Sequence, residues 1–173
     1  KKHRGISLFI VDLKSPGITI NPMWTIGGFR TNEVFYDNVK VPKESLVGEE
    51  NRGFYYIMEA LDNERIYTTS KIKGELAELI KYAKSSGKGK NPAIRHKLAQ
   101  LTIEMEITRL FALRIPWMLD KGNIPNYEAA MLKIFFAELE QRLVDTALQI
   151  LGPYGQLKKN SKWVPLGGKF EHE

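Results

Sequence analysis

The stretch Glu49–Ser70, EENRGFYYIMEALDNERIYTTS, decides how the rest of the chain is interpreted. From Gly53 onward, apolar residues recur every three or four positions, which predicts a helix with one core-facing stripe that continues to about Lys84. Glu64 occupies a position on that stripe. A buried carboxylate needs a partner or a raised pKa, and a raised pKa suits a general base. The alternative is a solvated acid at the edge of the stripe that forms a surface ion pair. The stripe consists of Phe54, Ile57, Met58 and Leu61 before Glu64, and of Thr68, Ile72, Leu76, Leu79, Ile80 and Ala83 after it.

Length and composition indicate an ordinary soluble protein. A chain of 173 residues is long enough for one domain with a real core, or for parts of two. It has no long apolar run and no signal-peptide pattern, so neither a membrane span nor secretion is expected, and the cytoplasm is the default location. The absence of cysteine excludes disulfides, thiolate metal sites and cysteine nucleophiles.

The net charge of +6 and the pI near 9.4 suit an anionic partner. Nucleic acid, a membrane surface and a phosphate-bearing ligand such as coenzyme A all fit, and so does a charge that serves only solubility. The basic residues are scattered, with small concentrations at 1–4, 84–97 and 158–162. None of these is interleaved with aromatic residues as a nucleic-acid groove requires, so nucleic acid is not expected.

Residues 1–48 have the pattern of β structure. Strands are predicted at 5–13 (GISLFIVDL), at 18–20 and at 33–42 (EVFYDNVKVP), with turn signals at Ser15-Pro16-Gly17 and Gly27-Gly28 between them. Three short strands do not make a complete sheet. We therefore expect the sequence to open in the middle of a β domain.

From Gly53 onward the periodicity is helical, which places a domain boundary near Asn51. A second helix is expected from Asn91-Pro92, a cap followed by proline, with a kink at Pro116. A third, broadly apolar helix is expected from Asn126 to Leu151. The predicted fold is α+β and mainly α: part of an antiparallel β domain (1–51), then three of the four helices of an up-and-down bundle (52–173). The buried seam of the second helix is Ile94, Leu98, Leu101, Met105, Thr108, Ala112 and Ile115.

The sequence shows no pattern for a metal site or a phosphate loop. The histidines at 3, 96 and 172 have no ligand-like spacing with one another or with acids. Gly27-Gly28 precedes a strand and not a helix amino terminus, so it does not form a phosphate loop. No metal is expected.

The order of these elements and two motifs resemble the acyl-CoA dehydrogenase family. A strand ending in D-x-V-x-V-P, followed by G-E-x-x-x-G-F, begins at Asp37 and ends at Phe54, and LQILGPYG stands at a later helix end. The resemblance implies FAD as cofactor, an acyl-CoA substrate, an electron-transfer flavoprotein or similar acceptor, and a homo- or hetero-tetramer. It also implies that this sequence is a fragment, without the amino-terminal domain and the last helix. The residues that meet the first motif are Asp37, Val39, Val41, Pro42, Gly48, Glu49, Gly53 and Phe54.

The resemblance also implies a mechanism, α,β-desaturation of an acyl-CoA thioester. A glutamate removes the α-proton while the β-hydride goes to the flavin. Glu64-Arg65 matches the placement of this base in the isovaleryl and long-chain types, with Arg65 supporting the pocket or pairing with Asp62. Asp62, Phe54 and Tyr55 would then contact the coenzyme A arm, although core packing is an alternative role for Phe54.

Two further stretches bear on the flavin. Gln149 and Gly152 match a Q-x-x-G-G motif that reaches the flavin diphosphate of a neighbouring subunit, but Pro153 replaces the second glycine and has no amide hydrogen. Many members also carry an arginine before F-G after the first bundle helix, and here Ser86 stands near that position. As substitutes for that charge, Lys84, Lys88 and Arg95 are the candidates.

These departures resemble the subgroup built from unlike subunits, in which some flavin sites are lost. Three hypotheses follow: a flavin-dependent acyl-CoA dehydrogenase, a non-catalytic partner subunit of a heteromeric one, and a free-standing helical binding module.

Overall fold

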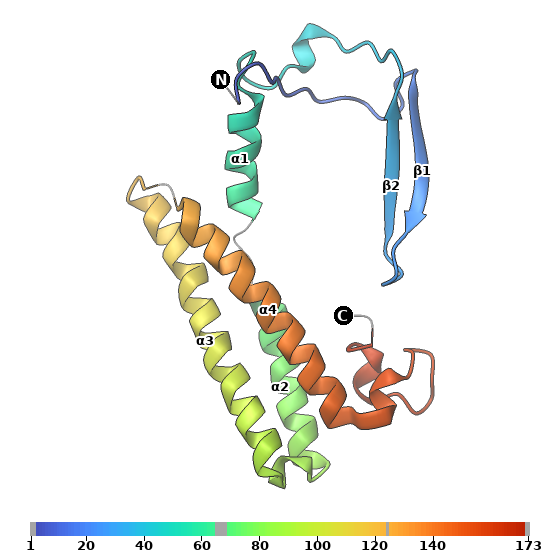
Figure 1. Cartoon of the computed structure of the whole chain (residues 1–173), viewed down its shortest axis with the longest axis vertical. Coiled ribbons are helices and arrows are strands. Elements are labelled where there is room, and N and C mark those ends of the chain that lie inside the picture. The colour runs from blue at the N-terminus through green and yellow to red at the C-terminus, as the bar shows by residue number, and fades with distance from the viewer. Residues whose placement is uncertain (1–2, 65–68, 124, 172–173) are drawn as a thin grey trace. The chain divides into compact units, whose positions relative to one another are not determined.

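The computed structural model describes residues 3–64, 69–123 and 125–171 (Figure 1). The chain divides into two compact units, Lys1–Asn63 and Glu64–Glu173, and each is described by itself. The first unit holds the strands and the second holds a bundle of helices. The domain boundary that we expect near Asn51 stays a prediction.

The first unit contains one hairpin. Strand β1 (Ile18–Trp24) pairs antiparallel with β2 (Arg30–Tyr36), so that Ile18 lies opposite Tyr36 and Trp24 opposite Arg30. The turn closes through a hydrogen bond from the Thr25 amide to the Phe29 carbonyl at 2.9 Å. Antiparallel β structure is therefore confirmed.

The predicted strand at 5–13 is wrong. In place of a ladder, this segment makes one β-bridge, Phe9 to Leu46, and its Ile10 amide donates to the Ser45 carbonyl at 2.9 Å. The segment therefore lies extended beside residues 45–47. Its large apolar side chains are exposed, and within the described residues they have no sheet face on which to pack; they are Ile6, Phe9, Ile10 and Leu13.

The boundaries predicted for the other strands also need correction. The second strand continues past Ile20 to Trp24, and the third ends at Tyr36 instead of Pro42. Asn38 has φ +48°, a left-handed conformation that interrupts extended pairing.

Two helices lie where the sequence predicts a single helix from Gly53 to Lys84. Helix α1 is Gly53–Glu64 and α2 is Ser70–Ser85, and residues 65–68, which include Thr68 of the stripe, lie outside the described residues. The α2 part of the stripe is buried as predicted except at Ile80, which is half-buried, and Leu79 is fully buried. The α1 part is not a buried core face, because Phe54, Met58 and Leu61 are only half-buried and Ile57 is exposed.

The second unit packs α2 against α3 (Pro92–Asp120) and α4 (Asn126–Leu151). As predicted, the Asn91 side chain caps α3 by accepting from the Ala93 amide at 2.9 Å. The helix continues through Pro116 to Asp120, and the predicted kink there stays a prediction. The predicted seam of α3 is confirmed, because its members are buried or half-buried.

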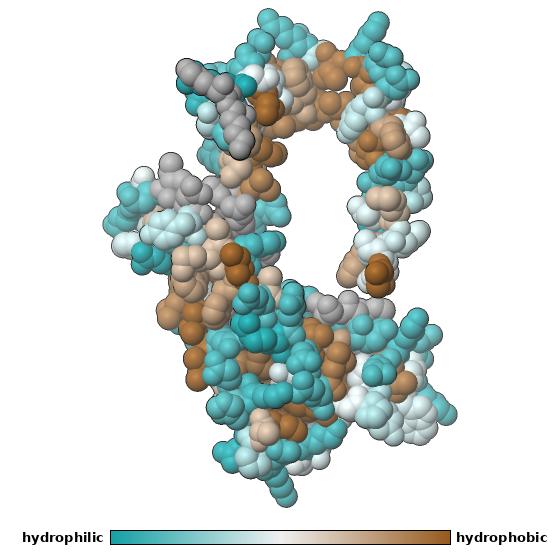
Figure 2. Space-filling model, viewed as in Figure 1, coloured by the Kyte–Doolittle hydropathy of each residue, from teal (hydrophilic) through white to brown (hydrophobic). Residues whose placement is uncertain are grey.

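Helix α4 supplies much of the core, although its apolar surface is not buried throughout. Leu139 and Leu143 are fully buried, whereas Met131 and Ile134 are exposed (Figure 2 colours the surface by hydropathy). The tail after α4 returns to the bundle, where Phe170 is 2% exposed and joins the main core cluster. Trp163 of the same tail stays exposed.

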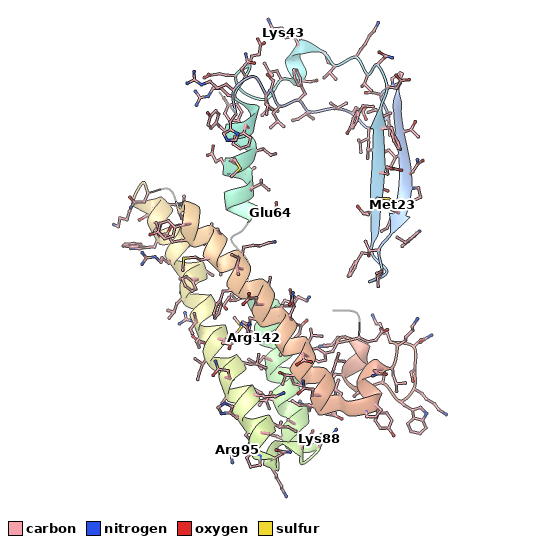
Figure 3. All side chains as sticks on the ribbon, viewed as in Figure 1. Met23, Lys43, Glu64, Lys88, Arg95 and Arg142 are labelled. Atoms are coloured by element: carbon pink, nitrogen blue, oxygen red, sulfur yellow. The ribbon has the colours of Figure 1, made fainter. Side chains whose placement is uncertain are left out.

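An ion pair joins α3 and α4 across the seam. Arg142 Nε lies 2.8 Å from Glu104 Oε2, and Arg142 Nη1 lies 3.4 Å from Glu138 on its own helix (Arg142 is labelled in Figure 3). The Glu104 side chain is only 12% exposed, so this contact is less screened by water than a surface pair.

Ile150→Ala tests the core. The side chain of Ile150 is 1% exposed at the carboxyl end of α4, so its truncation leaves a cavity and should lower the free energy of unfolding by about 2–5 kcal/mol. Ile103→Ala is the matched control, because Ile103 is 57% exposed on α3 and its truncation removes little buried surface. Chemical denaturation checks both, and equal losses would contradict this assignment of the core.

Candidate functional site

The start of α1 is held by close backbone contacts that explain two glycines of the motif. A Cβ at Gly53 would lie 2.5 Å from the Leu8 amide nitrogen, and its own amide donates to the Ile6 carbonyl at 2.8 Å. A Cβ at Gly48 would lie 2.5 Å from the Tyr56 ring. Residues larger than glycine would push the helix away from the segment beneath it. The motif therefore fixes where α1 begins.

Phe54 and Tyr55 lie together on the first turn of α1. Their rings meet edge to face at 6.0 Å, and Phe54 also stacks on His3 with centroids 4.2 Å apart. Phe54 is half-buried and Tyr55 is 46% exposed. Tyr55 thus presents an aromatic surface to solvent, whereas Phe54 is partly used in packing.

Glu64 is the last residue of α1, at the opposite end of the helix from Phe54 (Figure 3). Its side chain is exposed, so the buried environment expected from the stripe is not found around it. Arg65 lies outside the described residues, and for Asp62 the structure describes the backbone position in α1 alone. The pairing of these three residues therefore stays a prediction.

Gln149 and Gly152 lie together at the carboxyl end of α4. The Gln149 amide nitrogen donates to Asp145 Oδ2 at 2.7 Å, and its oxygen accepts from the Lys97 ammonium group. Gly152 has φ +67° and ψ −147°, and the position of a Cβ there would be open space. Pro153, without an amide hydrogen, is exposed beside it.

Two lysines next to these residues add positive charge to this end of the bundle. Lys97 of α3 touches Gln149, and Lys88 donates to the Ile150 carbonyl at 2.5 Å. Sequence reasoning included Lys88 among its candidates but missed Lys97, because only a three-dimensional contact brings α3 next to the end of α4. Both ammonium groups therefore contact residues of α4 that stand just before Gly152.

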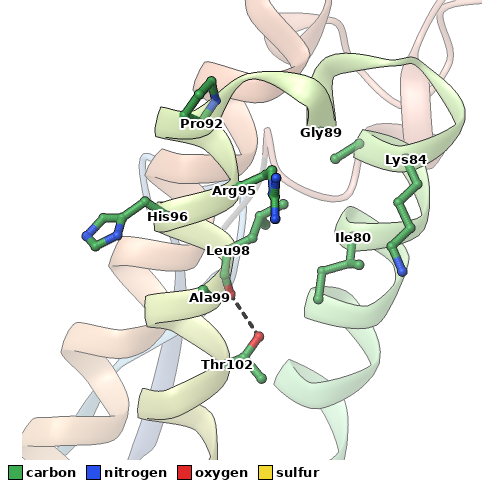
Figure 4. A pocket seen from close by; sticks show the side chains of 10 residues that line it. Ile80, Lys84, Gly89, Pro92, Arg95, His96, Leu98, Ala99 and Thr102 are labelled. Atoms are coloured by element: carbon green, nitrogen blue, oxygen red, sulfur yellow. Dashed lines mark hydrogen bonds between the residues drawn. The ribbon is translucent and has the colours of Figure 1, made fainter.

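A hollow lies between the carboxyl-terminal part of α2 and the amino-terminal part of α3 (Figure 4). Its volume is about 550 Å³, and its lining includes the cations Lys84 and Arg95. Ser86, which stands near the expected arginine, is exposed and does not line it. The structure therefore brings two of the three candidate cations to one hollow and assigns Lys88 to the α4 terminus.

Glu128 is a buried acid that sequence reasoning missed. It is 3% exposed on the first turn of α4, with its Oε1 3.9 Å from Arg114 Nη2. Among the described residues, its Oε2 has no hydrogen-bond partner. Its hydrogen bond with Tyr127, and next its negative charge, raise the pKa of the Tyr127 hydroxyl. Its burial follows from packing at the helix start, which periodicity does not reveal.

Neither a metal centre nor a membrane span is found in the described part of the chain. No group of three or more His, Cys, Asp or Glu side chains is placed there to hold an ion. None of the described helices has a stretch long and apolar enough to cross a lipid bilayer.

Residues 51–165 match a family profile described as "Acyl-CoA dehydrogenase, C-terminal domain". That profile covers more than half of the chain. The chain belongs to the acyl-CoA dehydrogenase family, as the motifs predict. Members of this family are FAD-dependent oxidoreductases.

Individual relatives agree with this assignment. The chain is 36% identical to the caffeyl-CoA reductase-Etf complex subunit CarC of Acetobacterium woodii, over 92% of this chain and 45% of that protein. It is 32% identical to the probable acyl-CoA dehydrogenase YdiO of Escherichia coli, over 88% and 43%. The solved ChsE4-ChsE5 complex from Mycobacterium tuberculosis superposes with a TM-score of 0.85 at 28% identity, over 99% and 46%. The chain thus spans somewhat less than half the length of these relatives.

Gly152→Ala tests the backbone at the end of α4. The torsions of Gly152 lie close to a region that is almost restricted to glycine, so alanine should cost about 1–3 kcal/mol of stability. Gly74→Ala is the control, because Gly74 lies inside α2 with open space around it and alanine favours a helix by about 0.5–1 kcal/mol. The midpoint temperature of thermal unfolding should therefore fall in Gly152→Ala and rise in Gly74→Ala. A shift in the same direction for both variants would contradict the conformation described for Gly152.

Proposed function

We propose that this chain is part of an FAD-dependent acyl-CoA dehydrogenase, with Glu64 as the general base. Family membership over residues 51–165 supports the class, and the Glu64-Arg65 pair supports the placement of the base.

In this mechanism the Glu64 carboxylate accepts the α-proton of the acyl-CoA thioester. FAD, when bound in the whole protein, supplies the acceptor for the β-hydride. Arg65 orients the carboxylate, and Tyr55, Phe54 and Asp62 contact the coenzyme A arm. Gln149 and Gly152, with Lys97 in contact with Gln149, would hold phosphate of the flavin of a neighbouring subunit. In the whole protein, an electron-transfer flavoprotein or a similar acceptor would take up the electrons.

The direction of the reaction is part of the proposal. One relative is named a caffeyl-CoA reductase, and reduction of an enoyl thioester is the same exchange of proton and hydride in reverse. In that direction a protonated Glu64 would return the proton to the α-carbon. We propose the desaturation direction, and a panel of saturated and unsaturated thioesters decides between them.

A non-catalytic partner subunit is the second candidate, because the phosphate-facing residues depart from the family pattern. Ser86 stands near the position of the family's arginine and has no charge, and Pro153 replaces a glycine and has no amide hydrogen. The Gln149 side chain already contacts Lys97 and Asp145. Relatives whose names include "complex" agree with a heteromer. Flavin content distinguishes the two, with one FAD per chain in a homomer and one per two unlike chains in the alternative.

Glu64→Gln tests the base in the full-length protein. The amide keeps the size of the side chain but cannot accept the proton, so kcat with the best thioester should fall by about 10²–10⁴-fold while flavin content is unchanged. Glu59→Gln in the same helix is the control and should leave kcat close to that of the wild type. Stopped-flow bleaching of the flavin measures both. Unchanged bleaching in Glu64→Gln would overturn the assignment.

An apolar face on α3 supports the proposed tetramer. Leu110, Leu113 and Trp117 are each more than half exposed, and a hollow of about 670 Å³ lies among them. An exposed patch of this kind indicates association.

Leu110→Asp should therefore weaken assembly. The new charge would have to be desolvated in the contact, which should shift the full-length protein toward a smaller species by light scattering at micromolar concentration. Gln141→Asp, which places the same charge on an exposed position of α4, should leave the mass unchanged. An unchanged mass for Leu110→Asp would exclude this face from the interface.

A further inference from the structure

The tail after α4 contains a short basic loop that the proposed function does not use. We call residues 157–168 the lysine loop, and their sequence is LKKNSKWVPLGG. Figure 1 shows the tail that contains this loop, in red, beyond the carboxyl end of α4. Its lysines and its tryptophan are the groups that need an explanation.

The lysine loop is anchored to the bundle at both of its ends. Before it, Gly155 is buried, and a Cβ at this position would lie 3.1 Å from the Leu148 side chain. After it, Phe170 is buried in the main core cluster. The loop also packs on itself, because Gly168 is buried and a Cβ there would lie 3.0 Å from the Lys159 backbone. Packing therefore determines the course of the loop.

Hydrogen bonds fold the middle of the lysine loop into two successive turns. The Ser161 amide donates to the Lys158 carbonyl at 2.8 Å, and the Val164 amide donates to the Ser161 carbonyl at 3.2 Å. The Ser161 hydroxyl oxygen also accepts from the Trp163 amide at 3.3 Å. Trp163 is nevertheless 68% exposed. A folded loop thus presents an indole ring to solvent.

The positive charge of the lysine loop is not neutralised by acids of this chain. Among the described residues, the three lysines of the loop form no ion pair, whereas Lys169 just after the loop pairs with Glu78. The sequence explains this difference in part, because no acid occurs between Asp145 and Glu171. The three lysines of the loop, all exposed, are Lys158, Lys159 and Lys162.

We propose that the lysine loop binds the surface of an anionic lipid bilayer. Indole rings and lysine side chains are groups that proteins place at the interface between lipid and water. The Lys162 ammonium group lies 5.1 Å from the centroid of the Trp163 ring, so cation and ring share one surface of the loop. In the bound state the three ammonium groups would contact lipid phosphates, and Trp163 would lie among the headgroups.

An acidic protein suits the lysine loop less well as a partner. Protein interfaces are enriched in arginine and depleted in lysine, and arginine binds carboxylates through two parallel hydrogen bonds. The tail from Gly152 to Phe170 has four lysines and no arginine. A bilayer attracts cations through its surface potential, for which lysine serves as well as arginine. The contact would be peripheral, since none of the described helices could cross a bilayer.

Sedimentation of the full-length protein with lipid vesicles tests the proposal. The wild type should bind vesicles with about 30% phosphatidylserine and should not bind phosphatidylcholine alone. The triple variant Lys158→Gln, Lys159→Gln and Lys162→Gln should lower the partition coefficient by about 100-fold, because each lysine contributes a factor of about five.

A matched control removes the same charge from three exposed positions outside the lysine loop. Lys81→Gln, Lys90→Gln and Lys121→Gln combined should keep the partition coefficient of the wild type. Charges that do not reach the bilayer are screened by salt and contribute little. All six lysines are exposed, so both triple variants should unfold at the temperature of the wild type.

Trp163→Phe tests the position of the indole ring. Bromine-labelled lipid should quench the tryptophan emission of the bound wild type. This quenching should be lost in Trp163→Phe, because the other tryptophans of the protein would stay outside the bilayer. Binding with equal quenching in wild type and variant would show that another surface faces the lipid, and would overturn the proposal.

Three further results would also overturn it. The first is a wild type that does not bind anionic vesicles, and the second is an equal loss in the control variant, which would make the attraction a general effect of net charge. The third is binding to polyglutamate and not to vesicles, which would assign the loop to an acidic protein. Flavin content and turnover do not enter these readouts, so this inference and the proposed function can fail separately.

Discussion

The packing of α4 across α2 and α3 is the constraint on which the rest of this chain depends. Leu79, Leu139 and Leu143 are almost completely removed from solvent in one cluster, and removal of aliphatic side chains from water is the main favourable contribution to folding. The pair between Glu104 and Arg142 also joins α3 to α4. In this packing Lys97 contacts Gln149, and Lys88 donates to the Ile150 carbonyl. The packing of the apolar core thus brings Lys88 and Lys97 to the carboxyl end of α4.

Sequence periodicity was sufficient for the bundle because each helix is long and has a regular buried face. Helix α3 begins at the predicted Asn91-Pro92 signal, and α4 runs from Asn126 to Leu151 as expected. The same reasoning failed for residues 5–13, whose β-branched residues have the composition of a strand but only one bridging partner. Strand formation depends on a neighbour, and composition does not show whether one is present. A helix forms its backbone hydrogen bonds within one segment, so its own sequence can predict it, whereas a strand needs a second segment with which to pair.

The candidate site was predictable to a lesser degree. The motif glycines and the end of α4 could be located from sequence, and the structure gives a steric reason for Gly48 and Gly53. Lys84 and Arg95 were candidates from the sequence, but the hollow that both line, and the contact of Lys97 with Gln149, could not be predicted because they depend on contacts between separate helices. For Glu64, the sequence predicted an environment that the structure does not show. Its place on the stripe indicated burial, but its side chain is exposed, so the case for this residue comes from the Glu-Arg pair and the family and not from periodicity.

The position of Phe170 has a consequence for synthesis on the ribosome. This ring belongs to the same core cluster as Ile72 and Leu79, although it follows them by most of the length of the bundle. Chains emerge from the amino terminus, so α2, α3 and α4 are all made before Phe170, which fills part of their core. Until residue 170 leaves the exit tunnel, the nascent bundle would display an unfilled apolar groove. How long that groove is open to chaperones or to other nascent chains therefore depends on how quickly continued translation moves Phe170 out of the tunnel.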